Sequence, residues 1–380
     1  MNAPSRQLFE PTTINGLRLE NRLVRSATWE GMCAENGLPT AELIDLYRGL
    51  ARGGVGLIIT GFASVTDDGK PLPGTMGMHN DAFAAEMQAL TEAVHREGGR
   101  ICVQLGHAGG QTRSTLCGGR PLAPSAVAAP QYHPEIPSEM TAADIKRVVE
   151  SFAAAALRAR DYGFDAVQLH AAHGYLINQF LSPHTNRRDD AYGGDLEGRS
   201  RLLLEVYGRM REAVGGDYPI LVKLNGSDNL SEGFCLEEAR LVAIALDAAG
   251  VDAIEVSSGT PASGERNPLR RGIDSPEREA YNLPLIQAIK PAVRCPVIVV
   301  GGIRSVWTAK GIVRRNEADY VALCRPLVQE PGLPKRWRWA EGDTLARCSS
   351  CNGCFKAALK GNFRCVKTEA QETTTMGKSA

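Results

Sequence analysis

The sequence predicts an α/β protein of the (β/α)8 TIM-barrel class with a C-terminal four-cysteine module. Three observations support this fold class: eight short apolar runs alternate with helical patterns, glycines follow the helices, and four cysteines cluster late in the chain. Continuous apolar runs are typical of parallel strands that are buried on both faces. A doubly wound open sheet is the alternative, but it normally carries a phosphate-binding turn after its first strand, and the chain has no GxGxxG.

The apolar runs predict the strands in chain order. They are Leu23–Val24, Val55–Thr60, Ile101–Leu105, Ala166–Leu169, Ile220–Leu224, Val251–Val256, Val297–Val300 and Tyr320–Cys324. Apolar residues at spacings of three and four predict helices over 83–97, 142–162, 202–214 and 236–249. Thr141 stands where a helix N-cap belongs.

Glycines past the helices mark where each helix ends. They are Gly98, Gly163, Gly215 and Gly250. The barrel is expected to occupy residues 1–345, the cysteine module 346–366, and a disordered polar tail 367–380. Two Gly/Pro-rich segments, 65–80 and 106–140, are too long to be simple connectors and are expected to cover the active face.

Composition narrows the range of partners. Lys+Arg and Asp+Glu each number 43, so the net charge of zero argues against a nucleic-acid partner. No apolar stretch approaches the length of a membrane span, and the first residues lack a signal-peptide core. We therefore expect a cytoplasmic protein that acts on a small molecule without a membrane partner. Since barrels with added loops often pair, we also expect a homo-oligomer.

Polar groups at the ends of the strands indicate a binding site, because functional residues of such barrels sit at the C-terminal strand ends. Gly301 and Gly302 follow the seventh run and Arg325 follows the eighth. Backbone N–H groups and an arginine at these positions predict a phosphate site. The alternative is a helix cap beside a surface arginine.

His170, His173 and Tyr175 follow the fourth run. The two histidines could ligate a metal, although no third ligand with suitable spacing is apparent. They could instead donate hydrogen bonds to a substrate oxygen, with Tyr175 as a proton donor. Two structural histidines are the third possibility.

At these residues the sequence resembles the Old Yellow Enzyme family of FMN-dependent NAD(P)H oxidoreductases. The matching stretches are NRLVRSAT (21–28), GGVGLIITG (53–61), QLGHAGG (104–110), PLAPSAV (121–127), LHAAHGYLINQFLSPHTNRRDDAYGG (169–194), GG (301–302) and CRPL (324–327). They cover nearly the whole chain in order, and the stretch 169–194 is highly specific.

The resemblance implies FMN bound at the C-terminal strand ends. Gln104 would contact the flavin pyrimidine edge, and Lys223 would lie near flavin N1 and O2, where a cation favours the reduced anion. The complete set of implied FMN-binding residues is Ser26, Ala27, Thr28, Thr60, Gln104, Lys223, Gly301, Gly302, Cys324 and Arg325. Relatives place a Thr or Cys near the flavin where this chain has Trp29.

The resemblance also implies the reaction. NAD(P)H would deliver a hydride to the flavin, which would pass it to an activated C=C bond such as that of an α,β-unsaturated carbonyl compound. The acceptor oxygen would bind to His170 and His173, and Tyr175 would supply the proton.

The late cysteines resemble a second feature, found in the larger branch of the family with trimethylamine dehydrogenase and 2,4-dienoyl-CoA reductase. The ligand set would be Cys348, Cys351, Cys354 and Cys365. In that branch the cysteines hold a [4Fe–4S] cluster that exchanges electrons with FMN. A structural Zn(Cys)₄ site and four unligated thiols are the alternatives.

Those larger relatives continue into nucleotide-binding domains, whose fingerprint this chain lacks. Electrons would then come from NAD(P)H directly or pass through a separate electron-transfer protein. An amine or ring-substrate dehydrogenase that sends electrons out through the cluster is a second possibility. A non-catalytic FMN/Fe–S sensor or carrier is a third, and a phosphate-binding barrel with a zinc knuckle and no flavin is a fourth.

Overall fold

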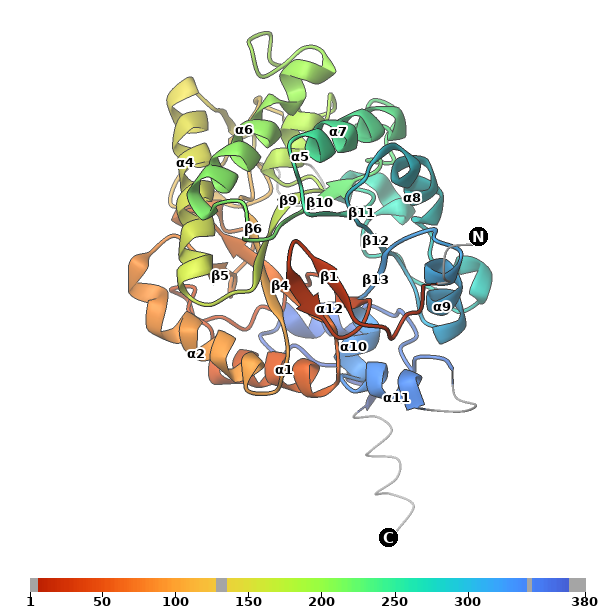
Figure 1. Ribbon diagram of the computed structural model, residues 1–380. Helices are drawn as coiled ribbons and strands as arrows, with labels where there is room; N and C mark the ends of the chain where they lie inside the picture. Colours follow the sequence, from red (N-terminus) through yellow and green to blue (C-terminus); the bar gives the residue numbers. More distant parts are fainter. Residues whose placement is uncertain (1–5, 128–134, 340–343, 369–380) are drawn as a thin grey trace.

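The computed structural model describes residues 6–127, 135–339 and 344–368, so most of the expected tail lies outside the described residues. Within these ranges, eight parallel strands form a barrel (Figure 1). They are β3 (Leu23–Arg25), β4 (Leu57–Ser64), β6 (Ile101–Gly106), β9 (Ala166–Ala171), β10 (Ile220–Asn225), β11 (Ala253–Ser257), β12 (Val297–Val300) and β13 (Tyr320–Leu323). The barrel is closed because β3 pairs with both β13 and β4. The predicted barrel class is confirmed.

Helices surround the barrel (Figure 1). They are α1 (Ala41–Arg52), α2 (Ala84–His95), α4 (Ala142–Asp161), α6 (Leu196–Val214), α7 (Leu236–Ala248), α8 (Leu283–Ile289), α9 (Val306–Arg314) and α11 (Leu333–Trp339). Thr141 caps α4 as predicted, in a capping box with Asp144. Helix α6 begins earlier than the predicted residue 202, because the Asp195 carboxylate accepts from the Gly198 N–H and caps the helix there.

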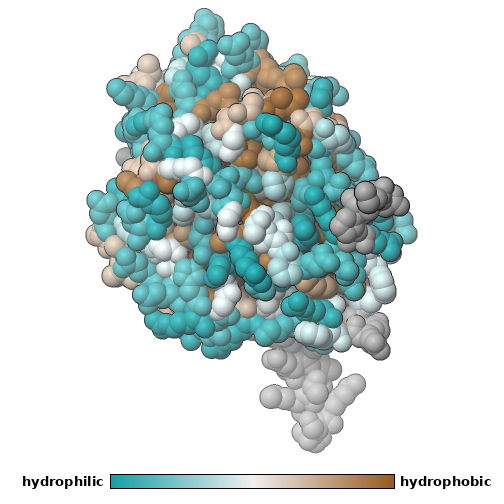
Figure 2. Space-filling model, viewed as in Figure 1, coloured by the Kyte–Doolittle hydropathy of each residue, from teal (hydrophilic) through white to brown (hydrophobic). Residues whose placement is uncertain are grey.

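A hairpin of β1 (Thr12–Ile14) and β2 (Leu17–Leu19) lies over one end of the barrel (Figure 1). Ile14 and Leu19 pack with inward-facing barrel residues such as Val24 and Leu221 in a buried apolar cluster. The hairpin therefore forms an apolar floor. Figure 2 shows that the outer surface on this side is mostly hydrophilic, with hydrophobic residues gathered over α7, where Leu241 and Ile244 are exposed.

A polar layer lies above the apolar floor inside the barrel. Gln104, Gln168, Lys223 and Glu255 are all buried. Gln104 is the register partner of Gln168, and Lys223 is the register partner of Glu255. Four neighbouring predicted runs thus contain a row of polar side chains, each two residues beyond a floor residue of its own strand.

The two long segments contain short elements of their own. The first holds the 3₁₀ helix η1 (Asp67–Gly69) and strand β5 (Met76–Gly77). The second holds α3 (Ser114–Cys117), β7 (Leu122–Ala123) and β8 (Ser138–Glu139), and its residues 128–134 are not described. Leu72 and Gln111 from these segments line the cavity at the strand ends, in agreement with the expected cover.

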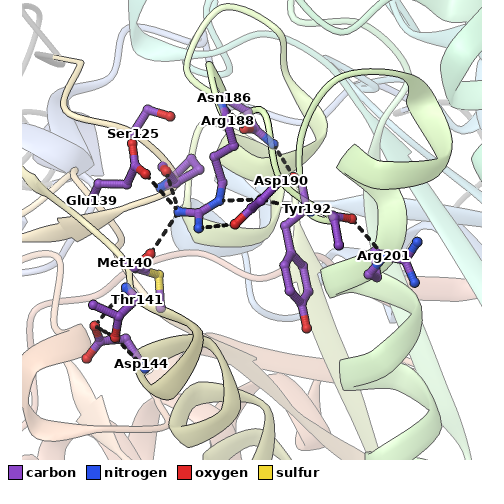
Figure 3. A network of polar contacts seen from close by, with 12 residues as sticks. Ser125, Glu139, Met140, Thr141, Asp144, Asn186, Arg188, Asp190, Tyr192 and Arg201 are labelled. Atoms are coloured by element: carbon purple, nitrogen blue, oxygen red, sulfur yellow. Dashed lines mark hydrogen bonds and ion pairs between the residues drawn. The ribbon is translucent and has the colours of Figure 1, made fainter.

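Arg188, from the highly specific motif, holds the second segment in place (Figure 3). Its Nη1 donates to the carbonyl oxygens of Pro124, at 2.9 Å, and Met140, at 2.8 Å. The guanidinium also pairs with Glu139 and Asp190. This half of the motif therefore anchors a loop, whereas its first half contributes α5 (Leu176–Leu181) and the histidines.

The chain closes with α10 (Arg325–Gln329) and α12 (Gly353–Ala358). Short 3₁₀ helices η2 (Asp81–Phe83), η3 (Pro261–Arg266), η4 (Pro276–Arg278) and η5 (Lys290–Ala292) complete the elements. Among the residues described, no helix combines the length and apolarity needed to cross a membrane.

Candidate functional site

The C-terminal strand ends open into a cavity of about 1470 Å³. This volume includes space that is open to solvent, and the C-terminal strand ends are where barrels of this class bind their ligands. The predicted site residues that line it are Ser26, Ala27, Thr28, Gln104, His170, His173, Tyr175, Lys223, Gly301, Gly302, Cys324 and Arg325. Sequence positions far apart therefore meet at one place.

Thr60 is the predicted cofactor residue that does not line this cavity. Its side chain is buried beneath it, where the hydroxyl donates to the Gly61 carbonyl and accepts from the Gln104 N–H at 3.2 Å. Thr60 thus fixes the backbone beside Gln104 and leaves the cavity wall to other residues.

His170, His173 and Tyr175 form an aromatic cluster on the cavity wall. The His170 ring centroid lies 5.3 Å from that of His173 and 4.9 Å from that of Tyr175. The Phe62 ring lies 5.0 Å from the Tyr175 ring and packs against both Tyr175 and His170. Three groups capable of donating hydrogen bonds are thereby held within one substrate-sized patch.

A hydrogen bond defines the tautomer of His170. Nδ1 of His170 accepts from the Ala172 N–H, so the proton of a neutral His170 ring resides on Nε2. Nε2 of His173 lies 2.8 Å from the Ser257 hydroxyl, and its backbone N–H donates to Asn225. Burial lowers the pKa of both histidines well below the usual value, and the neighbouring positive groups lower it further. Both rings are accordingly neutral hydrogen-bond donors at neutral pH.

His173 has a φ of 62°, in the left-handed region, followed by Gly174 at 75°. A left-handed conformation at a non-glycine residue is costly, and such residues are enriched at functional sites. Among residues 6–127, 135–339 and 344–368, no group of three or more His, Cys, Asp or Glu side chains is arranged to hold a metal ion. Substrate binding by this histidine pair stays a prediction.

Glycines and arginines make up the opposite end of the cavity. Gly301 and Gly302 have φ values of 140° and 71°, and a Cβ on Gly301 would lie 2.9 Å from the Tyr281 ring. Arg325 and Arg304 also line this end. The Nε of Arg304 is buried and has no hydrogen-bond partner in the described part of the chain. An orphaned buried donor beside a double glycine fits a phosphate group.

The wall beside Cys324 explains the position of Trp29. The Thr28 hydroxyl lies 2.7 Å from the Cys324 Sγ, so both residues face the cavity together. Trp29 also lines the cavity, and its ring meets the Phe355 ring edge to face at 6.0 Å. The buried indole N–H has no hydrogen-bond partner among the described residues.

The residues present therefore fit FMN. A buried cation and two amide or hydroxyl groups lie at the polar layer, while a glycine cradle with two arginines lies at the far end. This arrangement matches a molecule with a polar ring system at one end and a phosphate at the other.

The four late cysteines, Cys348, Cys351, Cys354 and Cys365, line one small cavity of about 300 Å³ together with Arg325. Backbone N–H groups of Ser350 and Gly353 donate to the sulfurs of Cys348 and Cys351, each at 3.4 Å. Such N–H···S contacts accompany thiolate ligands in metal sites. The side chains are not arranged as a metal site within the described residues, so metal binding by these cysteines stays a prediction.

The cysteine segment also completes the larger cavity. Ser350, Asn352, Cys354, Phe355 and Phe363 line it. The Arg325 guanidinium donates to the Asn352 Oδ1 at 2.6 Å and to the Ser350 carbonyl at 3.3 Å. The arginine of the expected phosphate site is thus anchored by residues between the cysteines.

Sequence reasoning missed Arg304, Gln168 and Glu255. Arg304 lies two residues after the double glycine, in GGIR, and could have been found as a second positive group of the phosphate site. Gln168 and Glu255 interrupt apolar runs at the same position as Gln104 and Lys223, as ICVQL, AVQL, ILVKL and DAIEV show. A polar residue repeated at one register across neighbouring strands was the available signal.

Comparison with known proteins places the chain among flavin-dependent oxidoreductases. Residues 7–340 match the NADH:flavin oxidoreductase / NADH oxidase family. The chain is 38% identical over 364 residues to a protein named NADH oxidase from Thermoanaerobacter brockii, covering 94% of this chain and 54% of that protein. The chain therefore spans about half the length of this relative.

Two solved structures are also similar. A complex of 2-naphthoyl-CoA reductase with 2-naphthoyl-CoA superimposes with a TM-score of 0.88 at 27% identity, covering 94% of this chain and 56% of that one. An Old Yellow Enzyme homologue from Zymomonas mobilis superimposes with a TM-score of 0.75 at 27% identity, covering 88% and 92% of the two chains. These matches are to the family that the sequence motifs resemble.

Proposed function

Because the chain belongs to the NADH:flavin oxidoreductase / NADH oxidase family, we propose that it is an FMN-dependent enzyme that uses NAD(P)H to reduce activated C=C bonds. The observation that carries this proposal is the meeting of His170, His173 and Tyr175 at a cavity that also holds Lys223 and the Gly301–Gly302 cradle. FMN, when bound, supplies the capacity to accept a hydride from NAD(P)H and to deliver it to an acceptor.

The cofactor would be held by residues of the cavity. In this proposal Lys223, Gln104 and Ser26 would contact the polar edge of the ring system. Gly302, Arg304 and Arg325 would contact the phosphate, and all six residues line the cavity. Trp29 and Phe355 add apolar surface on the wall beside Cys324.

The acceptor would be a conjugated carbonyl compound. This class includes conjugated ring compounds and conjugated thioesters. Its carbonyl oxygen would accept hydrogen bonds from Nε2 of His170 and from the ring of His173. Since both rings are neutral, they stabilise developing negative charge without giving up a proton. The 2-naphthoyl-CoA reductase that superimposes on this chain acts on a conjugated ring thioester, as its name states, which supports this substrate class.

Tyr175 would donate the proton to the carbon next to the carbonyl group. We expect Tyr175→Phe to slow the reduction of 2-cyclohexenone by at least tenfold, which corresponds to about 1.4 kcal/mol in the barrier. The reduction of bound FMN by NADPH is expected to stay within twofold of wild type. Stopped-flow measurement of each half-reaction separates the two, and equal loss in both would contradict the role of Tyr175.

We further propose that the four cysteines hold a [4Fe–4S] cluster that exchanges electrons with the flavin and with a partner electron-transfer protein. Support comes from the shared cavity of the four sulfurs and from the N–H groups directed at two of them. A Zn(Cys)₄ site would use the same ligands. Metal analysis and the visible spectrum of protein purified without oxygen distinguish them: iron with broad absorbance supports the cluster, and one zinc per chain contradicts it.

A further inference from the structure

A chain of buried side chains joins the polar groups that face the cavity. The Lys223 ammonium lies 3.0 Å from Oε1 of Glu255 and donates to the Ser26 hydroxyl at 2.8 Å. That hydroxyl donates to the same carboxylate oxygen at 2.6 Å. The second oxygen of Glu255 accepts from the Gln168 amide at 2.8 Å, and the Gln168 oxygen accepts from the Gln104 amide at 2.7 Å.

The five residues occupy two positions relative to the cavity. Ser26, Gln104 and Lys223 line it, whereas Gln168 and Glu255 lie beneath them and have no exposed surface. Every cavity-facing member is therefore tied to Glu255, either directly or through Gln168.

We infer that Glu255 is a positioning residue that sets the reduction potential of the bound flavin by offsetting the Lys223 charge and fixing the Gln104 amide. The inference rests on the proposed function, because it concerns the FMN site. It assigns roles to Gln168 and Glu255, which do not line the cavity.

The electrostatic part follows from charge balance. Two-electron reduction by hydride adds one negative charge to the neutral flavin ring, while the nicotinamide leaves as NAD(P)⁺. An uncompensated ammonium beside the ring would favour the reduced form strongly in a buried site. Glu255, in contact with Lys223, offsets that charge and so keeps the potential low enough for the reduced flavin to pass its hydride on.

The orientational part follows from hydrogen-bond chemistry. A carboxylate can only accept, so Gln168 must present its NH₂ group to Glu255 and its oxygen to Gln104. Gln104 must then donate through its own NH₂ group. Its carbonyl oxygen is left for a donor in the cavity, such as a ring N–H of the cofactor.

The other titratable groups near Lys223 do not replace Glu255. His170 is the register partner of Lys223 on β9, and His173 follows it on the same cavity wall. Both histidines are neutral at neutral pH, since burial lowers their pKa. Glu255 is therefore the negative group in contact with this ammonium.

The test is the midpoint potential of bound FMN in the full-length protein, measured by reductive titration against reference dyes at pH 6 and pH 9. Glu255→Gln is expected to shift the two-electron equilibrium at pH 6 at least tenfold toward reduced flavin, which is about 30 mV. At pH 9 the shift should shrink, because an unpaired buried lysine loses its proton more readily. Equal potentials in wild type and variant at both pH values would overturn the inference.

Three further variants complete the design. Glu255→Asp keeps the charge and is expected to stay within threefold of wild type. The double variant Gln168→Glu/Glu255→Gln moves the carboxylate from Glu255 to position 168, out of contact with Lys223. Its flavin equilibrium should lie at least threefold further toward the reduced form than that of Glu255→Asp. If Glu255→Gln alone does not fold, the test compares Glu255→Asp with the double variant. Equal midpoint potentials in these two proteins would overturn the inference.

Gln168→Leu keeps the ion pair and removes both amide contacts. We expect it to weaken FMN binding at least fivefold, and unchanged binding would remove Gln168 from the inference. Wild-type protein that binds no FMN would contradict the proposed function, whereas equal potentials in FMN-loaded variants would contradict only the role of Glu255.

Discussion

The cysteines of the C-terminal segment differ in exposure and in thiol pKa, although they line one small cavity. The Gly353 N–H that donates to its sulfur lowers the pKa of Cys351, and this residue is exposed. Burial instead raises the pKa of Cys354 to about 12. Since the thiolate is the reactive form, metal-free protein should be modified first at Cys351.

We therefore expect iodoacetamide at pH 7.5 to alkylate Cys351 at least tenfold faster than Cys354. Peptide mass spectrometry over a time course measures both rates in one sample. Cys102, which is fully buried, serves as the unreactive control. Faster labelling of Cys354 would contradict the assigned environments.

Gly302 is a position where adding a single Cβ atom is expected to affect FMN binding. An alanine there would adopt a left-handed conformation at a cost of about 1–2 kcal/mol, and its Cβ would lie 3.1 Å from Tyr281 and Ile273. Gly302→Ala is expected to weaken FMN binding at least tenfold by narrowing the cradle. Gly16→Ala is the matched control, because Gly16 has a similar φ of 76° with open space around it, in the hairpin β1–β2. Fluorescence titration with FMN compares the two, and equal affinities would show that Gly302 is not a cofactor contact.

At the scale of elements, one arginine holds together two loops that are far apart in sequence. Arg188 joins the segment around β7 and β8 to the turn before α6, and its side chain is only 7% exposed. Since hydrogen bonds from a charged donor contribute about 1.5–3 kcal/mol each, Arg188→Ala should lower the free energy of unfolding by about 2–4 kcal/mol. Limited proteolysis should then cut within 122–140.

The matched control for this prediction is Arg209→Ala, which removes ion pairs with Glu150 and Glu212 from an exposed helix face. Ion pairs on the surface contribute little to stability, so the free energy of unfolding measured in urea should change only slightly. A small loss in both variants would mean that Arg188 does not anchor the segment.

The strands were predictable from the sequence because a strand buried on both faces must be apolar nearly throughout. Their order around the barrel followed from the alternation of strand and helix. The polar layer was harder to predict, since one Gln or Glu in an apolar run carries no sign that it points inward. Gln168 and Glu255 become meaningful only when the register places them beside Gln104 and Lys223.

The start of α6 and the position of Thr60 show the same limit. Asp195 was a valid N-cap by residue type, but the apolar periodicity begins later. Thr60 belongs to a family motif, yet its hydroxyl is used by the backbone. A family motif identifies which residue of the chain occupies a given position. It does not give the contacts of the side chain, because these depend on neighbours from other strands.

At the scale of the whole molecule, the buried histidines make stability depend on pH. The pKa of His170 and His173 is lowered by folding, so the unfolded chain binds more protons below about pH 6.5. The free energy of unfolding should therefore decrease as pH falls from 7 to 5, by up to about 1.4 kcal/mol per pH unit for each histidine.

Urea unfolding at pH 5, 6, 7 and 8 measures this dependence. Replacing both histidines by asparagine should flatten the profile between pH 5 and 7. A profile of unchanged slope in the double variant would assign the pH dependence to other groups.

Homo-oligomerisation and a cytoplasmic location remain predictions from the sequence.

The anchoring of Arg325 by Ser350 and Asn352 has a consequence for how the protein is made. These residues are synthesised late, after every strand of the barrel, and so are Phe355 and Phe363, which line the same cavity. Until they have been translated, the cavity lacks part of its wall and Arg325 lacks these two contacts. Stable flavin capture should therefore follow translation of the cysteine segment, and a chain truncated before residue 350 should bind FMN more weakly than the full chain.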